Sequence, residues 1–291
     1  MRLALAERLH VNVYTSDAKS ILSQTSGFIA AAGFTHSLSP ARNCTYGCSY
    51  CYVPTLGVFG GLKKDDWRHW GAWTTFKANA PELLARALTP EQIIYCSPLV
   101  DPYQPAESVE AMMPRILDVL IHRPPRVFVV QTRGPLIVRD LDRLVRLSQR
   151  TTVRIGFSVT TNREDVRRRY EPHCATVRER LDAIGQLRES GVEVHATLAP
   201  ILPCDPEALA RLAVEATGRD VIADPLHSRE NRSHGAVTRE VARRISERWG
   251  ETRWHESDFQ AEVLERMRLE AERLGQRLGV GVEAFSWLAS L

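Results

Sequence analysis

The sequence lacks long apolar runs and has no strong excess of charge of either sign. No stretch of its 291 residues is apolar enough for a signal peptide or a membrane span, and charged residues recur through the first 20 positions. The 38 basic and 35 acidic residues give a formal charge of +3, so overall charge does not predict nucleic-acid binding, although a local basic patch is compatible with it. We therefore expect a cytoplasmic protein with no membrane-spanning segment, in a compartment where thiols stay reduced.

The chain also lacks a GxGxxG motif after a first strand, which argues against a Rossmann-like sheet, the second-best interpretation of the fold. What is present is an alternation of β-prone runs and helical periodicity, which predicts an α/β fold with a parallel sheet and helical crossovers, of open or closed barrel type. The expected strands are 91–97, 126–132, 152–161, 192–202 and, as the last one, 219–226. The expected helices between them are 108–122, 138–150, 176–190 and 206–217, with Gly191 as a C-cap signal after the third.

Three segments are expected along the chain. Residues 1–37 are interpreted as an N-terminal leader that packs on the core, and residues 38–228 as the barrel. Residues 229–291 are interpreted as a helical C-terminal extension that is highly charged and ends in an amphipathic helix near 256–278.

The six cysteines favour metal ligation or isolated buried thiols over disulfides in a reducing compartment. Cys44, Cys48 and Cys51 are crowded into RNCTYGCSYCYVP with the spacing C-x3-C-x2-C. Three thiolates on one short loop can each bind a different iron of a cubane and leave the fourth iron open, whereas ordinary electron-transfer clusters hold all four irons by cysteine. An open iron can bind S-adenosylmethionine (SAM) through its amino and carboxylate groups.

Two other interpretations of the cysteine loop remain. One is a zinc site completed by His36 or His69, although neither has the spacing of a zinc finger. The other is a set of three buried thiols that bind no metal.

A C-x3-C-x2-C motif with an aromatic residue before its last cysteine, here Tyr50, resembles the signature of the radical SAM superfamily. The resemblance extends over about residues 19–225 and is closest to the spore photoproduct lyase-like branch. The stretches that carry it are 19–54, DPYQPAE at 101–107, TRGPLIVRD at 132–140, FSVTT at 157–161, YEP…RLDAI…SGVEV at 170–194 and APILP at 199–203. It implies a partial (β/α)6 TIM-type barrel with a [4Fe–4S] cluster and SAM at its open, C-terminal end.

The resemblance further implies an enzyme that reductively cleaves SAM to methionine and a 5′-deoxyadenosyl radical, which abstracts hydrogen from an organic substrate. A reduced flavodoxin or ferredoxin is the implied electron donor. Cofactor-binding roles follow for residues that match the family pattern, namely Tyr50, Ser97, Arg133, Ser158, Arg180 and Ile201.

In this pattern, Tyr50 presents its backbone to the adenine of SAM, and Ile201 packs on that adenine. The two arginines pair with the SAM carboxylate, Ser97 contacts the methionyl group, and Ser158 contacts the ribose or the methionine. Backbone capping by the serines, surface ion pairs of the arginines and a plain core contact of Ile201 are the alternatives.

Cys96 lies close to the place where spore photoproduct lyases carry a cysteine that returns a hydrogen atom to the product radical. The lyases follow it with Thr-Ser-Asp, whereas this chain continues Ser97-Pro98-Leu99. The alternative for Cys96 is a small buried hydrophobe on a strand. Cys174 and Cys204 also depart from the family pattern. They are interpreted either as substrate ligands or radical partners at the barrel mouth, or as incidental residues.

Three functions are therefore considered. The first is a lyase-like enzyme acting on a nucleobase, nucleoside or nucleic acid; the second is a radical SAM enzyme of small-metabolite biosynthesis or peptide modification; the third is an iron–sulfur sensor or electron-transfer protein. The absence of a basic hairpin in the C-terminal section argues against extraction of a lesion base from a duplex. Residues 65–77, with Trp67, Trp70 and Trp73, are interpreted as a nucleic-acid surface or as a helical core stripe.

Overall fold

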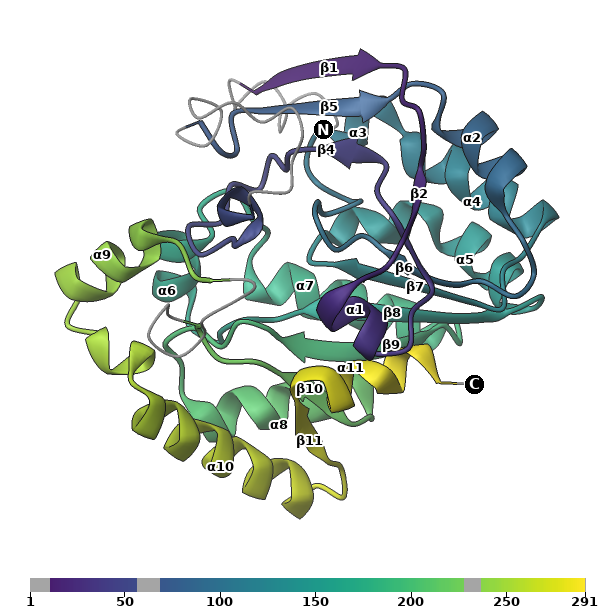
Figure 1. The fold of residues 1–291 in the computed structure, drawn as a ribbon. Coiled ribbons are helices and arrows are strands. Elements are labelled where there is room, and N and C mark those ends of the chain that lie inside the picture. Colours follow the sequence, from purple (N-terminus) through teal and green to yellow (C-terminus); the bar gives the residue numbers. More distant parts are fainter. Residues whose placement is uncertain (1–10, 57–68, 228–236, 291) are drawn as a thin grey trace.

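A mostly parallel sheet forms the centre of the protein. The computed structural model describes residues 11–56, 69–227 and 237–290 (Figure 1). Within them, eight strands lie in the order β11-β10-β9-β8-β7-β6-β3-β2, and every neighbouring pair is parallel except β2 and β3. Their bounds are β2 Leu22–Gln24, β3 His36–Leu38, β6 Ile93–Cys96, β7 Val127–Thr132, β8 Thr152–Ser158, β9 Glu193–Leu198, β10 Val221–Ala223 and β11 Leu278–Val280.

Two layers of helices cover the two faces of this sheet. One layer consists of α2 (Ala80–Ala87), α4 (Met112–His122), α5 (Leu141–Ser148), α7 (Val177–Glu189) and α8 (Pro206–Thr217). The other face is covered by α1 (Gly27–Ala31) and α11 (Gly281–Ala289), which lie side by side in front of the strands in Figure 1. The remaining helical elements are η1 Val53–Thr55, α3 Glu107–Glu110, η2 Pro135–Asp140, α6 Glu164–Tyr170, α9 Glu240–Arg248, η3 Thr252–His255 and α10 Ser257–Arg273.

Side-chain alternation along the strands separates the two faces. Phe128 and Val130 belong to the large core beneath α4 and α5, whereas Val127 and Val129 pack in a smaller core with residues of α1 and α11. Such a two-residue period is what a strand imposes when both of its faces are buried. Residues two positions apart on a strand, which we describe as having the same parity, therefore pack against the same layer of helices.

Local signals in the sequence explain where the crossover helices begin and end. Thr176 and Glu179 form a capping box at the start of α7, and Gly191 follows its end with φ +81°, as expected for a C-terminal glycine. Asp205 caps α8 by accepting a hydrogen bond from the backbone N–H of Ala208 at 3.0 Å. These caps leave the strand ends between the helices free to carry functional loops.

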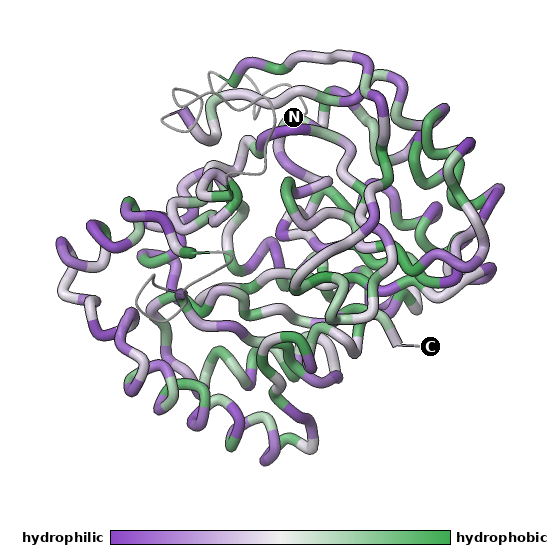
Figure 2. The backbone as a smooth tube through the Cα atoms, in the orientation of Figure 1, coloured by the Kyte–Doolittle hydropathy of each residue, from purple (hydrophilic) through white to green (hydrophobic). Residues whose placement is uncertain are grey.

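The predicted α/β fold with a mainly parallel sheet is confirmed, and the expected strands and helices between 91 and 226 all have counterparts. One expectation was wrong, because the strand at 219–226 is not the last. β11 pairs in parallel with β10, with Val221 opposite Leu278, so the C-terminal section contributes a strand as well as helices. The expected amphipathic helix near 256–278 corresponds to α10, whose apolar and polar residues alternate along the tube in Figure 2.

A second, small sheet has the order β1-β5-β4, with bounds β1 Asn12–Ser16, β5 Trp73–Lys77 and β4 Ala41–Arg42. The helical stripe considered for residues 65–77 is wrong over 73–77, because Trp73 begins the strand β5 and Trp70 is buried in the main core. Trp67 lies outside the described residues. Nothing in the described part of the chain combines the length and apolarity of a membrane-crossing helix.

Candidate functional site

The cysteine loop lies between β4 and η1 and is fixed by buried hydrogen bonds. Asn43 adopts φ +63° and accepts a bond from the backbone N–H of Cys44 through its side chain at 2.8 Å. The backbone N–H of Thr45 donates to Gln104 Oε1 at 2.8 Å, and that of Ser49 donates to the carbonyl of Tyr170 at 2.9 Å. The loop is thus held between the segment after β6 and the end of α6, near the carboxyl ends of the parallel strands.

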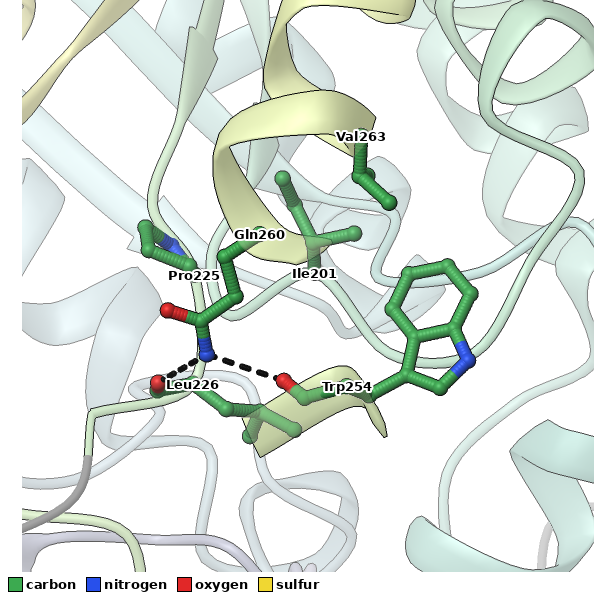
Figure 3. Close-up of a pocket in the computed structure, with 6 residues that line it drawn as sticks. All are labelled: Ile201, Pro225, Leu226, Trp254, Gln260 and Val263. Atoms are coloured by element: carbon green, nitrogen blue, oxygen red, sulfur yellow. Dashed lines mark hydrogen bonds between the residues drawn. The ribbon is translucent and has the colours of Figure 1, made fainter. Parts of the chain in front are cut away.

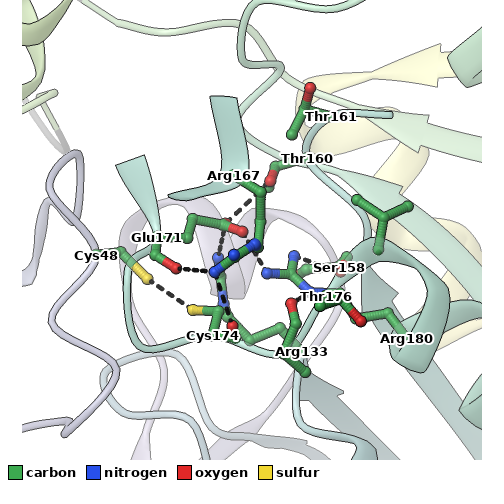
Figure 4. Close-up of polar contacts among 12 residues, drawn as sticks. Cys48, Arg133, Ser158, Thr160, Thr161, Arg167, Glu171, Cys174, Thr176 and Arg180 are labelled. Atoms are coloured by element: carbon green, nitrogen blue, oxygen red, sulfur yellow. Dashed lines mark hydrogen bonds and ion pairs between the residues drawn. The ribbon is translucent and has the colours of Figure 1, made fainter. Parts of the chain in front are cut away.

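A buried carboxylate, Glu171, gathers side chains from four parts of the chain beside this loop, and three of these partners, Arg133, Thr160 and Arg180, are labelled in Figure 4. Arg133 Nη1 lies 2.5 Å from Glu171 Oε1, and Arg180 pairs with Oε2. The hydroxyls of Tyr50 and Thr160 also donate to Oε1, the latter at 2.9 Å. Since Glu171 is 0% exposed, its charge is balanced almost entirely by these partners.

The pKa of Glu171 reflects this balance. Burial alone would raise it, but the charges of Arg180 and Arg133 and the hydrogen bond from Tyr50 lower the pKa to about 2. The carboxylate is therefore ionised at neutral pH, and the two guanidinium groups remain charged beside the cysteine loop.

A second carboxylate, Asp101, joins the ends of two strands. Its oxygens accept hydrogen bonds from the hydroxyl of Thr132 at 2.6 Å and from the backbone N–H groups of Tyr103 and Arg133 at 2.9 and 2.8 Å. Burial raises its pKa. Asp101 thereby fixes the turn that directs the side chain of Arg133 toward Glu171.

The loop cysteine Cys48 lies next to this network. Its Sγ lies 3.7 Å from Sγ of Cys174, and one ligand atom each from Cys48, Glu171 and Cys174 lies within 4.8 Å of the others. The hydrogen bond with Cys174, and then the charge of Arg133, lower the pKa of Cys48 in spite of its burial. A lowered pKa favours the thiolate, the form of cysteine that binds metals.

The residues around the loop fit a sulfur-rich cluster. Cys44, Cys48 and Cys51 are all free thiols, and the first two are buried. Two buried donors that flank them, Asn43 Nδ2 and Ser49 Oγ, have no hydrogen-bond partner among the described residues. Inorganic sulfides and thiolates of an iron–sulfur cluster accept such hydrogen bonds, so the donor set suits the [4Fe–4S] cluster expected here.

The structure brings four of the expected cofactor-binding residues together. Tyr50, Arg133 and Arg180 meet at Glu171, and the carbonyl of Ser158 accepts a bond from Arg180 Nη1 at 3.4 Å. The expectation for Tyr50 concerned only its backbone, yet its hydroxyl takes part in the Glu171 network. The hydroxyl of Ser158 accepts from Gln131 Nε2 at 2.9 Å on the face of the sheet turned toward α1 and α11.

The other expected residues lie apart from this network. Ser97 is buried after β6 with its hydroxyl 3.3 Å from that of Ser39. Ile201 lines a small apolar pocket with Trp254 and Val263, next to Gln260, which donates to the carbonyls of Leu226 and Trp254 (Figure 3). The side chain of Ile201 thus packs against the C-terminal section.

Cys96 is 0% exposed and belongs to the main core. In the sheet it stands opposite Leu38 on β3 and Val130 on β7. It therefore shares their parity and faces the layer of α4, away from Gln131 and Ser158. This placement favours the interpretation of Cys96 as a buried core thiol over that of a hydrogen donor.

The sequence interpretation missed Glu171 and Asp101 as site residues. Each stands inside a stretch that carried the family resemblance, YEP and DPYQPAE. The available signal was an acidic residue directly followed by proline, after the strand β6 for Asp101 and after the helix α6 for Glu171. An acidic side chain in such a buried turn needs hydrogen-bond donors.

At the carboxyl ends of the parallel strands, the cysteine loop meets two charged arginines that share one buried carboxylate, and this is where barrel-type α/β enzymes carry their active sites. Residues 38–213 match the family profile of the radical SAM superfamily. The match covers more than half of the chain, and the protein belongs to this superfamily. It is thus an enzyme whose cofactors are a [4Fe–4S] cluster and SAM.

Two curated relatives are described as uncharacterized proteins. The protein MJ0683 of Methanocaldococcus jannaschii is 27% identical over 171 residues, which are 59% of this chain and 62% of the relative. The protein Rv2578c of Mycobacterium tuberculosis is 26% identical over 178 residues, which are 60% of this chain and 52% of the relative. The matches span little more than half the length of these relatives.

Among solved structures, the fold is similar to that of spore photoproduct lyase. One such structure superposes with a TM-score of 0.63 over 92% of this chain and 82% of the lyase at 15% identity. Another, a lyase mutant with bound AdoMet and dinucleoside spore photoproduct, gives a TM-score of 0.63 over 91% of this chain and 81% of the lyase at 16% identity. At this level of identity the likeness concerns the fold.

Proposed function

We propose that residues 38–228 form a partial (β/α)6 barrel in which Cys44, Cys48 and Cys51 hold the cluster, with 1–37 and 229–291 packed on it. The observation that carries the proposal is the contact between the cysteine loop and the Glu171 network at the carboxyl ends of the strands. When bound, the cluster and SAM supply a 5′-deoxyadenosyl radical by reductive cleavage of SAM. The chain supplies the thiolates, the charges around them and the exclusion of water.

Arg133 and Arg180 take different parts in this proposal. Arg180 is 1% exposed and already donates to Glu171 and to the carbonyls of Ala175 and Ser158. The Arg133 side chain is 15% exposed, so it can turn one edge toward the carboxylate of SAM. Arg133 is then the cation that binds the cofactor, and Arg180 is a positioning residue that keeps Glu171 in place.

Three hydroxyl or amide groups on neighbouring strands offer further polar contacts. Gln131 on β7 donates to Ser158 on β8 and to Thr197 on β9, at 2.9 and 2.7 Å. These groups lie on the face that carries no crossover helices, beneath the Glu171 network. We assign to them the ribose or methionine contacts and the orientation of the substrate. Tyr50, Ser97 and Ile201 keep their expected roles toward SAM as proposals.

The substrate proposed is a nucleobase, a nucleoside or a nucleic acid. Support comes from the likeness in fold to spore photoproduct lyase, one structure of which holds a dinucleoside photoproduct. The second candidate is a small metabolite or a peptide, which the near-neutral charge of the chain equally suits. A salt-sensitive affinity for DNA or RNA separates the two, because only phosphate contacts release counterions in proportion to their number.

A reduced flavodoxin or ferredoxin is the proposed electron donor, and the cytoplasm is the proposed location. The six cysteines are all free thiols, which suits a reducing compartment. The test of the whole proposal is anaerobic reconstitution with iron and sulfide, followed by addition of SAM and a reductant. Formation of 5′-deoxyadenosine supports an enzyme and excludes a sensor or electron-transfer protein. Transfer of deuterium from a labelled candidate substrate into 5′-deoxyadenosine identifies the carbon attacked.

A further inference from the structure

Cys174 lies against one of the three cluster cysteines although it stands 126 positions away from it in the sequence. The two sulfurs, of Cys48 and Cys174, are 3.7 Å apart, whereas a disulfide bond measures about 2.05 Å. The two sulfurs must therefore approach by about 1.6 Å for a bond to form. Cys204 and Cys96 show no sulfur–sulfur contact among the described residues, so the arrangement is particular to Cys174.

The backbone on both sides keeps this contact in place. The N–H of Ser49, next to Cys48, bonds to the carbonyl of Tyr170 at 2.9 Å. The carbonyl of Cys174 accepts from the buried Arg167 at 3.1 Å, and its N–H donates to the carbonyl of Glu171 at 3.0 Å. The cysteine loop and the segment after α6 are therefore joined independently of the thiols, and the thiols meet as a consequence.

We propose that Cys48 and Cys174 form a reversible disulfide when the protein carries no cluster, and that this bond protects Cys48 from irreversible oxidation. The oxidant is a peroxide. The Cys48 thiolate attacks one peroxide oxygen and the O–O bond breaks, which gives a sulfenic acid and a hydroxide that takes up a proton to become water. The Cys174 thiol then attacks the sulfenic sulfur, forms the S–S bond and releases a second water. A dithiol reductant restores both thiols, after which the loop can take up iron again.

The bond itself does not depend on the proposed function, which enters only through the role of Cys48 as an iron ligand. The first arm of the experiment maps the bond in the cluster-free full chain, treated with one equivalent of hydrogen peroxide and alkylated before trypsin digestion. The expected product joins the peptide 43–63, which holds the three loop cysteines, to the peptide 170–178. Bonds confined to peptide 43–63, with Cys174 alkylated as a free thiol, overturn the proposal.

The second arm measures iron content rather than activity. After excess peroxide, then dithiothreitol, then iron and sulfide, the unaltered protein and the control Cys204→Ala should regain most of their iron. Cys174→Ala should regain at most half as much and carry a sulfinic acid at Cys48, because the thiol that lies against Cys48 is then missing and cannot intercept the sulfenic acid. Equal recovery in Cys174→Ala and the control contradicts the protective role. If the unaltered chain forms the mapped bond and a Cys48→Ala variant takes up iron equally well, the inference about the bond stands and the proposed cluster site is refuted.

Discussion

Replacing Glu171 by glutamine tests the energetics of the network that surrounds the cysteine loop. Glutamine keeps the size and one carbonyl acceptor of Glu171 but removes the charge that Arg133 and Arg180 share. Arg180 is 1% exposed, so the change leaves a cation buried without its partner. Removing one member of a buried pair costs about 3–5 kcal/mol.

The pKa of Glu171 leads to a similar stabilisation. It falls from 4.5 to about 2, and each unit of lowering corresponds to about 1.4 kcal/mol, so that ionised Glu171 stabilises the fold by roughly 3 kcal/mol. In a domain of this size each kcal/mol shifts the melting temperature by about 2–4 °C. The melting temperature of Glu171→Gln should therefore be on the order of 10 °C lower at neutral pH.

The pH dependence has a definite sign. Because the pKa is lowered in the folded state, the contribution of Glu171 is complete above its unfolded value near 4.5 and is lost as the pH falls toward 2. Thermal unfolding of the cluster-free proteins between pH 7 and pH 3 should show the two curves converging in acid. The control is Glu265→Gln, whose exposed pair with Arg268 contributes little. A Glu171→Gln protein that melts within about 2 °C of the unaltered protein refutes the reasoning.

Other predictions concern the cluster, the buried thiol and the backbone. Replacing Cys44, Cys48 or Cys51 by alanine should abolish both the formation of 5′-deoxyadenosine and the absorbance of the cluster. Cys96→Ala should leave SAM cleavage intact, and a change in the final product, read by mass spectrometry, would reveal a hydrogen donor. Gly134→Ala should cost about 1–3 kcal/mol in chemical denaturation, since its Cβ would meet the carbonyl of Tyr103 at 2.4 Å. Gly185→Ala, in open space on α7, should instead stabilise by about 0.5–1 kcal/mol.

Opposite results would be equally informative. Activity in any of the three loop variants contradicts the assignment of the cluster ligands. An unchanged product with normal turnover in Cys96→Ala rejects the donor role and leaves the core thiol. Equal stabilities of Gly134→Ala and Gly185→Ala would mean that the turn after β7 yields easily to an added methyl group.

Much of the fold was predictable because its signals are local. The buried runs that became β7 and β8 and the periodic helix that became α7 are each long enough to be recognised alone. β11 has three residues and is defined by pairing with β10, which no local pattern announces. The same holds for Trp73, whose three-residue spacing from Trp70 resembled a helix although it begins a strand.

The site divides in the same way. The cysteine spacing sits within one short loop and is visible in the sequence. The partnership of Tyr50, Arg133 and Arg180 depends on Glu171, which joins them across more than a hundred positions. Which face of the sheet the Cys96 side chain points to depends on the register of β6 with its neighbours. The sequence alone therefore could not show whether Cys96 points toward the core or toward a substrate.

We propose that three cysteines of one loop hold the cluster at which SAM is cleaved. The most direct measurement is the yield of 5′-deoxyadenosine from SAM under strictly anaerobic, reducing conditions, compared between the reconstituted protein and the variant with alanine at all three positions. We expect the former to form 5′-deoxyadenosine and the latter to form none. Equal yields from the two proteins, or tight binding of zinc by the loop with no cleavage under any reducing condition, would contradict this proposal.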